Sequence, residues 1–381
     1  MKKCLSNILL SVILLLVSCQ IDPPLYLPDK DNEPVDVTIP IVITDISVLW
    51  NVNFEEYIDT AWYYGWDEKD ERLFGGMNPY TIPNTFNIID YYHNGTDGSY
   101  NNTDHFIVNG YTFRRQYRYG NHDMELWSEP STQDNSTQYI IIDETDRYDI
   151  KAYTNHSTHL NSAYNQPEVI YSGNIYNIHI TPNIEDYDYY DPIEKVYVKT
   201  LNTMLYPLVY TYLIQVILLN NNDKVINVSP SPYISGFSNI TNVIDGNNGH
   251  HNANILYTSR FKKEVDYNGE KASACGSKLL TFGKSGLIDG YGRQNRFTRA
   301  NIGRTYDDVD NIITMGFKFY NDCDSVYRFN VTSQVNEHLN GGIITLVIDC
   351  DTLKTPYSKN NGGIFEPYVK DYDEIVYDIT M

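Results

Sequence analysis

Two short runs of aspartate place carboxyl groups close enough along the chain to act together. They are Asp186, Asp188 and Asp191, and Asp307, Asp308 and Asp310. A glycoside hydrolase needs two carboxyl groups about 5 to 9.5 Å apart across a sugar, and Ca²⁺ is held by loop carboxylates and carbonyls. Neither run has the D-x-D-x-D-G spacing of a calcium loop. In a chain with 49 acidic and 28 basic residues such runs are typical of solvated loops, so we expect neither catalysis nor metal binding there.

The paired histidines His250 and His251 lie in GNNGHHNAN (246–254). Adjacent side chains point apart on a strand, and no H-E-x-x-H motif or third ligand is nearby, so the segment is typical of a polar loop. The chain also lacks a G-x-S-x-G elbow and a G-x-x-x-x-G-K phosphate loop. We therefore expect a protein that is not an enzyme and that uses no cofactor and no metal.

An aromatic cluster occupies TAWYYGWDEKDE (60–71). Its members are Trp62, Tyr63, Tyr64 and Trp66. Aromatic rings in a loop can stack on sugar rings, which makes this segment the best candidate for a glycan contact. The alternative, which we favour, is a strand whose aromatic side chains fill a β-sheet core.

The first nineteen residues have the layout of a lipidated secretory leader. Lys2 and Lys3 precede an apolar stretch that is too short to remain as a membrane span. The ending Leu16-Val17-Ser18-Cys19 resembles the bacterial lipobox, which implies acylation of the Cys19 thiol and cleavage before it. Two or three acyl chains anchor a protein stably at about 0.8 kcal/mol per buried methylene. The alternative is a secreted protein with an incidental cysteine.

Cleavage there would leave 363 of the 381 residues, which is long enough for two domains. Loss of the two leader lysines would change the net charge from −21 to −23, and such acidity argues against a nucleic-acid partner. Three further cysteines, Cys275, Cys323 and Cys350, show no C-x-x-C spacing. Two alternatives remain for these cysteines: one disulfide, with Cys323–Cys350 as the preferred pair, or three free thiols.

The elements that would position these residues are predicted to be β-strands. Short β-branched or aromatic runs separated by Asn, Asp, Gly and Pro clusters dominate, and sustained helical periodicity is scarce. The predicted strands are 38–50, 86–92, 138–143, 148–154, 175–182, 194–201, 278–283, 312–320, 325–332, 342–349 and 374–380. We expect mostly antiparallel sheets, a short helix over 333–339 and a long surface loop over 284–311.

The longest apolar run, YPLVYTYLIQVILL (206–219), is too short and too polar at Thr211 and Gln215 for a transmembrane helix. It predicts a central strand covered on both faces. The following NNND (220–223) predicts a turn, and KVINVSP (224–230) predicts the returning strand of a hairpin.

Several stretches resemble a family of Bacteroidales lipoproteins that is distantly related to the fimbrillins. They are NPYTIPNTFNI (78–88), YPLVYTYLIQVILLNNNDKV (206–225), PYISGFSNI (232–240) and LLTFG (279–283). The resemblance implies two tandem transthyretin-like antiparallel β-sandwich domains after a signal peptide and a short linker. We place a signal peptide at 1–18, a lipidated tether at 19–36, and the sandwiches at 37–190 and 191–381.

The resemblance also implies a function and a location. Fimbrillins assemble by strand exchange after proteolysis behind a basic residue, and the only basic residue between Cys19 and Trp66 is Lys30, in the acidic setting PDKDNE. An uncleaved member suits an anchor or a standalone surface protein. We expect a non-enzymatic pilus accessory or anchor subunit or a surface adhesin, lipid-anchored in the outer membrane. The alternative is an outer-membrane glycan-binding lipoprotein.

Three tripeptides resemble the O-glycosylation motif found in envelope proteins of the same bacterial phylum. They are centred on Thr60, Ser325 and Thr352, each preceded by an aspartate. Since so short a motif recurs by chance, these are candidate modification sites only.

Overall fold

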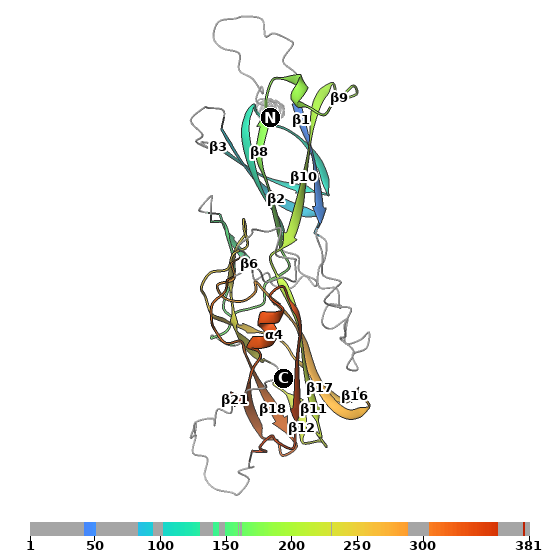
Figure 1. The fold of residues 1–381 in the computed structure, drawn as a ribbon, viewed down its shortest axis with the longest axis vertical. Coiled ribbons are helices and arrows are strands. Elements are labelled where there is room, and N and C mark those ends of the chain that lie inside the picture. The colour runs from blue at the N-terminus through green and yellow to red at the C-terminus, as the bar shows by residue number, and fades with distance from the viewer. Residues whose placement is uncertain are drawn as a thin grey trace, which may run out of the picture.

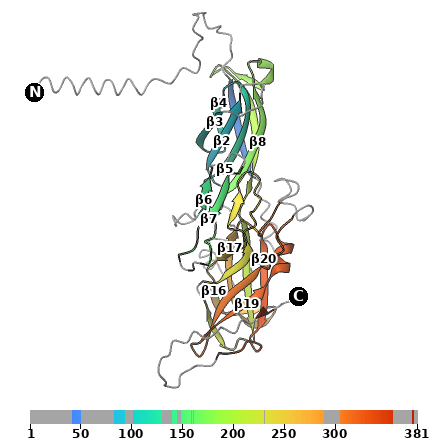
Figure 2. The ribbon, with the colours of Figure 1, turned by 90° about the vertical axis from the view of Figure 1, so that its left-hand side faces the viewer.

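The computed structural model describes residues 42–50, 83–93, 102–129, 140–144, 149–158, 160, 162–229, 231–288, 305–356 and 376–377. For residues 42–50, 102 and 376–377 it describes the backbone alone. The described chain forms an elongated molecule in which two β-rich bodies are stacked end to end (Figures 1 and 2). The all-β expectation is confirmed.

The N-terminal body is an eight-stranded sheet in the order β3-β2-β5-β8-β10-β1-β4, with β9 paired to β10. Its strands are β1 (Val42–Trp50), β2 (Thr85–His93), β3 (Asn102–Asn109), β4 (Thr112–Gln116), β5 (Gly120–Ser128), β8 (Tyr171–Ile180), β9 (Tyr189–Asp191) and β10 (Val196–Pro207). β3 and β4 lie at opposite ends of this order, yet only Gly110 and Tyr111 connect them. The sheet must therefore curl round so that its two ends approach each other.

The inside of this curled sheet is apolar because alternate residues of each strand face it. Phe86 and Ile88 of β2 and Met124 and Leu126 of β5 are fully buried in one hydrophobic cluster, together with Tyr171. A 3₁₀ turn, η1 (Ile184–Asp186), precedes β9 at the end of this body (Figure 1).

The C-terminal body contains two sheets that enclose a large core. One sheet has the order β16-β17-β11-β20, and the other has the order β15-β13-β18-β19-β21 with β12 paired to β18. Their strands are β11 (Tyr210–Leu219), β12 (Val225–Val228), β13 (Tyr233–Phe237), β15 (Ala253–Leu256), β16 (Arg260–Tyr267), β17 (Glu270–Thr281), β18 (Ile312–Phe319), β19 (Asp324–Asn330), β20 (Gly342–Asp349) and β21 (Val376–Tyr377). The predicted helix is confirmed as α4 (Thr332–Glu337).

The prediction for the long apolar run is half right. β11 is a central strand, buried on both faces, between antiparallel β17 and parallel β20. The hairpin is wrong: because β17 and β20 already occupy both edges of β11, β12 crosses to the opposite sheet and pairs with β18. Mostly antiparallel pairing is confirmed, with parallel exceptions at β1–β10, β11–β20 and β19–β21.

The expected surface loop over 284–311 is wrong at its first residues, 284–287, which are buried, whereas residues 305–310 are exposed or half-buried, as expected of a loop. Lys284 is 1% exposed, and its ammonium donates to the backbone oxygen of Val309 (3.1 Å) and to the side-chain oxygens of Asn311 (3.0 Å) and Asn336 (2.8 Å). Three acceptors for three N–H groups make this burial tolerable.

A small third sheet joins the two bodies, in the order β14-β7-β6. β6 (Ile140–Asp143) and β7 (Lys151–Thr154) come from the N-terminal half, and β14 (Ile240–Asn242) comes from the C-terminal half. The domain boundary expected at 190/191 falls inside β9, which pairs with β10 within the eight-stranded sheet.

Candidate functional site

The groove that holds β1 is the candidate functional site. β1 runs parallel to β10 over nine register positions, from Val42 opposite Tyr197 to Trp50 opposite Leu205. It runs antiparallel to β4 over five positions. Residues 51–84 separate it from β2. A strand from one end of the chain therefore fills an interior position of the sheet, and without it both β4 and β10 would present open edges.

Arg114 of β4 links the two elements that flank β1. Its guanidinium binds Asp191 (2.8 Å) and Glu194 (3.1 Å) of the β9–β10 hairpin and donates to the Tyr189 hydroxyl (2.8 Å). The hydrogen bond from Arg114, together with backbone N–H donors of Glu194 and Ile193, holds the pKa of Asp191 below its ordinary value. In turn Asp191 raises the pKa of Arg114, so this ion pair keeps both charges at neutral pH.

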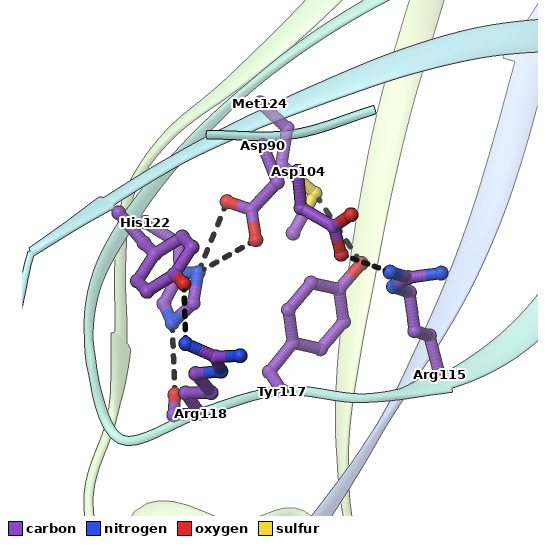
Figure 3. Close-up of polar contacts among 8 residues, drawn as sticks. Asp90, Asp104, Arg115, Tyr117, Arg118, His122 and Met124 are labelled. Carbon is purple, nitrogen blue, oxygen red and sulfur yellow. Dashed lines mark hydrogen bonds and ion pairs between the residues drawn. The ribbon is translucent and has the colours of Figure 1, made fainter. Parts of the chain in front are cut away.

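A second polar group lies buried inside the same sheet (Figure 3). The Nδ1 of His122 lies 2.9 and 3.0 Å from the two carboxylate oxygens of Asp90, and its Nε2 lies 2.8 Å from the backbone oxygen of Arg118. Asp90 is 3% and His122 1% exposed. Because both ring nitrogens face acceptors, the ring donates from both, and with an ionised carboxylate it is an imidazolium.

Aromatic rings seal this pair from water. Tyr92 stacks on the His122 ring at 5.5 Å between centroids, and Tyr117 meets it edge-on at 5.4 Å. Arg118 donates to the Tyr92 hydroxyl at 2.6 Å. Burial and the nearby Asp90 carboxylate raise the pKa of Tyr117, whose hydroxyl faces the Met124 sulfur at 3.6 Å. With no nucleophile against the imidazole among these contacts, the group ties β2, β5 and the β4–β5 connection together.

Arg115, also from the β4 end of the sheet, closes the seam between β4 and β3. Its guanidinium lies 3.6 Å from the centroid of the Phe106 ring and forms an ion pair with Asp104 (Figure 3). The two sheet ends that the β3–β4 connection brings together are thus held by one arginine.

The first aspartate run does not form a catalytic pair. Asp191 is bound by Arg114, while Asp188 accepts from the Thr200 backbone N–H at 2.6 Å and Asp186 accepts from the Thr181 hydroxyl. Each carboxylate is thus engaged with a different group of the η1–β9–β10 region, as expected for a loop.

The second run brings a histidine, an aspartate and a serine together in an unproductive order. Asp307 accepts from the Ser285 hydroxyl (2.7 Å) and lies 2.7 Å from His250 Nδ1. A nucleophilic triad needs histidine between serine and carboxylate, whereas here the carboxylate is in the middle. Its contacts, the Ser285 hydrogen bond foremost, lower the pKa of Asp307. Within the described residues no group of three or more His, Cys, Asp or Glu side chains has an arrangement that could hold a metal ion.

Cys275, Cys323 and Cys350 are free. Cys275 and Cys350 are buried and Cys323 is half-buried. Burial raises the pKa of the Cys275 thiol and raises the pKa of Cys350 to about 12. Of the two alternatives, the structure shows three free thiols, and Cys323 and Cys350 do not form a disulfide in it.

Most predicted site residues lie outside the described part of the chain. They are Cys19, Thr60, Trp62, Tyr63, Tyr64 and Trp66. Of the other two, Ser325 is half-buried in β19, and Thr352 is exposed in the turn after β20, where its hydroxyl donates to the Asp349 backbone oxygen at 2.6 Å. Among the described residues no helix is long and apolar enough to cross a bilayer.

Sequence reasoning missed the Asp90–His122 pair, although a signal for it exists. In β2, Phe86, Ile88 and Asp90 fall on one face by strand alternation, so an acid sits at a core position. A carboxylate there predicts a buried cationic partner. The groove for β1 had no such signal, because pairing between distant strands leaves no local pattern.

Comparison with known proteins finds no matching family model and no matching curated protein. Among solved structures, the chain is similar to a candidate adhesin from Bacteroides ovatus (TM-score 0.47, 14% identity, 85% of this chain and 98% of that chain). It is also similar to a candidate adhesin from Bacteroides thetaiotaomicron (TM-score 0.44, 11% identity, 83% and 93%). A third similar structure is the fimbrial anchor protein Mfa2 from Porphyromonas gingivalis (TM-score 0.39, 9% identity, 81% and 90%). The similarity spans most of each chain at low identity.

Proposed function

We propose that the chain is a non-enzymatic, fimbrillin-like lipoprotein of the cell envelope, serving as an accessory or anchor subunit of a pilus or as a surface adhesin. The lipobox-like ending at Cys19 and the sequence phrases shared with fimbrillin relatives support this proposal. Two tandem sandwich domains, with Cys19 acylated in the outer membrane and residues 20–36 as a tether, belong to the same proposal.

The placement of β1 carries the proposal. β1 comes from the N-terminal part of the chain and fills an interior position of the sheet. In strand exchange a partner's strand would take the place of β1, and it would find main-chain donors and acceptors on both β4 and β10. Between Cys19 and β1, Lys30 is the one basic residue available to a trypsin-like processing step. A chain that keeps β1 in its own groove is complete by itself, which suits an anchor or tip position better than a shaft position.

The direct test is recovery of partners from the native envelope. The full chain, with an affinity tag at its C-terminus, is cross-linked in cells and purified, and the captured proteins are identified by mass spectrometry. Pilus subunits are expected, together with partition of the chain into the outer-membrane fraction. A Cys19→Ala variant should lose the membrane partition and so serves as the matched control.

Two results would contradict the proposal. A chain that never captures a pilus subunit and never supports adhesion cannot have this function. A Cys19→Ala chain that still partitions with membranes would refute the lipid anchor.

A further inference from the structure

A surface cavity that is largely open to solvent lies at the end of the molecule opposite β9 and the beginning of β1. Its volume is about 470 Å³, and it is formed where the β11–β12 turn, the β18–β19 turn and the segment after β20 meet, near the lower end of Figure 1. It is lined by Asn222, Asp223, Lys224, Tyr320 and Thr355. The volume lies within the range of about 300–1,000 Å³ that is usual for small-molecule sites.

The three segments around the cavity are fixed to one another. The Lys224 ammonium donates to the backbone oxygens of Cys350 (2.6 Å) and Leu353 (2.7 Å). The Asn321 amide donates to the Pro356 oxygen at 2.7 Å, and the Tyr320 backbone N–H donates to the Lys224 oxygen at 3.1 Å. The walls are therefore formed before a ligand arrives, which lowers the entropic cost of binding.

The β11–β12 turn holds an unusual backbone that aims two polar side chains outward. Asn220, Asn222 and Asp223 have φ values of 51°, 41° and 61°, in the left-handed region that asparagine and aspartate tolerate best among non-glycine residues. The buried Asn221 side chain fixes the turn by donating to the Val225 oxygen (2.9 Å) and the Ser273 hydroxyl (2.8 Å). Such backbone conformations cluster at binding sites, where the surroundings maintain them.

The chemistry of the lining selects the class of ligand. Tyr320 is 64% exposed, and no described residue forms a hydrogen bond with its hydroxyl, so its ring and hydroxyl are both presented to solvent. The Asn222 amide, the Asp223 carboxylate and the Thr355 hydroxyl supply donors and acceptors. The lining disfavours an anion, because the Lys224 ammonium is occupied by carbonyls and the Lys263 ammonium beside the pocket is paired with the Asp223 carboxylate at 2.9 Å. An aromatic face beside amide, carboxylate and hydroxyl groups fits a neutral polyol ring.

We propose that this cavity binds a neutral saccharide unit, with Tyr320 stacking on the sugar ring and Asn222 and Asp223 accepting hydrogen bonds from its hydroxyls. The inference deepens the proposed adhesin function and rests on it for its biological setting. If the tether leads into the start of β1, the cavity lies at the end far from the membrane, where a surface ligand is accessible. It is a different site from the aromatic cluster at residues 60–71.

The test uses the full chain without its leader and saturation-transfer NMR. The probes are the methyl glycosides of glucose, galactose, mannose, fucose and N-acetylglucosamine, each tested alone. At least one is expected to receive saturation from the protein. Tyr320→Ala and Asp223→Ala are each expected to weaken that binding about ten-fold or more, since both remove a cavity wall group.

Three control variants separate the site from general effects. Lys271→Ala removes the 2.7 Å ion pair with Glu264, which involves no residue of the cavity lining, so binding should be unchanged. Tyr190→Ala removes an exposed tyrosine at the opposite end, and it should also leave binding unchanged. The Trp62→Ala/Trp66→Ala double variant should keep its saccharide binding if the cavity is the site. If this double variant loses binding while Tyr320→Ala keeps it, the proposal is overturned.

Two further outcomes overturn it: no glycoside of the panel receives saturation, or Tyr320→Ala binds as tightly as the unaltered chain. Envelope capture of pilus subunits by the Tyr320→Ala chain reports on the proposed pilus function separately, because the cavity lies far from the β1 groove.

Discussion

Removal of the imidazole from the buried Asp90–His122 pair should be among the most destabilising single changes in the N-terminal body. His122→Leu leaves the Asp90 carboxylate, 3% exposed, without its cationic partner. Breaking a buried ion pair from one side costs about 3–5 kcal/mol, because the remaining charge keeps its desolvation penalty. Asp90→Leu/His122→Leu removes both charges and replaces them with apolar volume, so it should cost less than His122→Leu alone. Such a result corresponds to a coupling energy of about 2 kcal/mol or more.

The assay is urea unfolding followed by tryptophan fluorescence; among the four tryptophans, Trp127 is fully buried at the base of this body. His179→Leu is the matched control: it makes the same substitution at an exposed position of the neighbouring strand β8 and should change stability by no more than about 0.5 kcal/mol. The reasoning is refuted if His122→Leu costs less than about 1 kcal/mol or if the double variant shows the sum of the two single costs.

Three further predictions concern single groups. Arg114→Gln should raise the pKa of Asp191 towards its ordinary value of about 3.9, which carboxyl-carbon NMR measures. In the unaltered protein the lowered pKa of Asp191 stabilises the fold at pH values above the unfolded-state pKa. This stabilisation disappears as the pH falls through the folded-state pKa. In the native protein iodoacetamide should modify Cys323 but not Cys275 or Cys350, because only Cys323 is partly exposed. In urea without reductant it should modify all three thiols. If two of the cysteines stay unmodified in urea, they form a disulfide and the prediction is wrong. If Thr60, Ser325 or Thr352 is glycosylated, the intact mass of the protein from its native cells should include added sugar. Of Ser325 and Thr352, the exposed Thr352 is the more accessible. An unmodified mass refutes glycosylation at all three residues.

Local patterns predicted the strands well where a strand has its own signature. The apolar run of β11 could be assigned because a strand buried on both faces needs no alternation. Strands β3 (Asn102–Asn109) and β4 (Thr112–Gln116) escaped notice because they are polar and half exposed. The wrong hairpin at β12 has a different cause: a turn sequence fixes the change of direction but not the partner strand, which depends on which edges distant strands have already taken.

The candidate sites divide in the same way. The expected leader and its lipobox-like ending at Cys19 form a linear pattern, so they can be predicted without any fold, and they lie outside the described residues. The cavity at the tip combines residues 222–224 with Tyr320 and Thr355, which follow Lys224 by 96 and 131 residues in the chain. Each of them is ordinary for a polar turn when taken alone. Their common site exists only because β11, β18 and β20 end at the same edge of the C-terminal body, and this follows from sheet order rather than from composition.

The two bodies are joined by a sheet and a hydrophobic cluster to which both contribute. Strand β7 pairs with β6 on one side and with β14 of the other half on the other side, and the Thr154 N–H donates to the Asn239 oxygen at 3.0 Å. Beneath this sheet, Trp127 from the N-terminal body and Phe282 from the C-terminal body are buried in one hydrophobic cluster. A linker of polar residues would let the halves swing independently, whereas a shared sheet and a shared core resist bending because any hinge motion would expose apolar surface. If the chain is anchored through Cys19 and binds a saccharide at its tip, as proposed, it needs that resistance, since a flexible joint would let the tip fold back towards the membrane. The buried junction would therefore keep the proposed anchor end and the proposed binding end apart in the same chain.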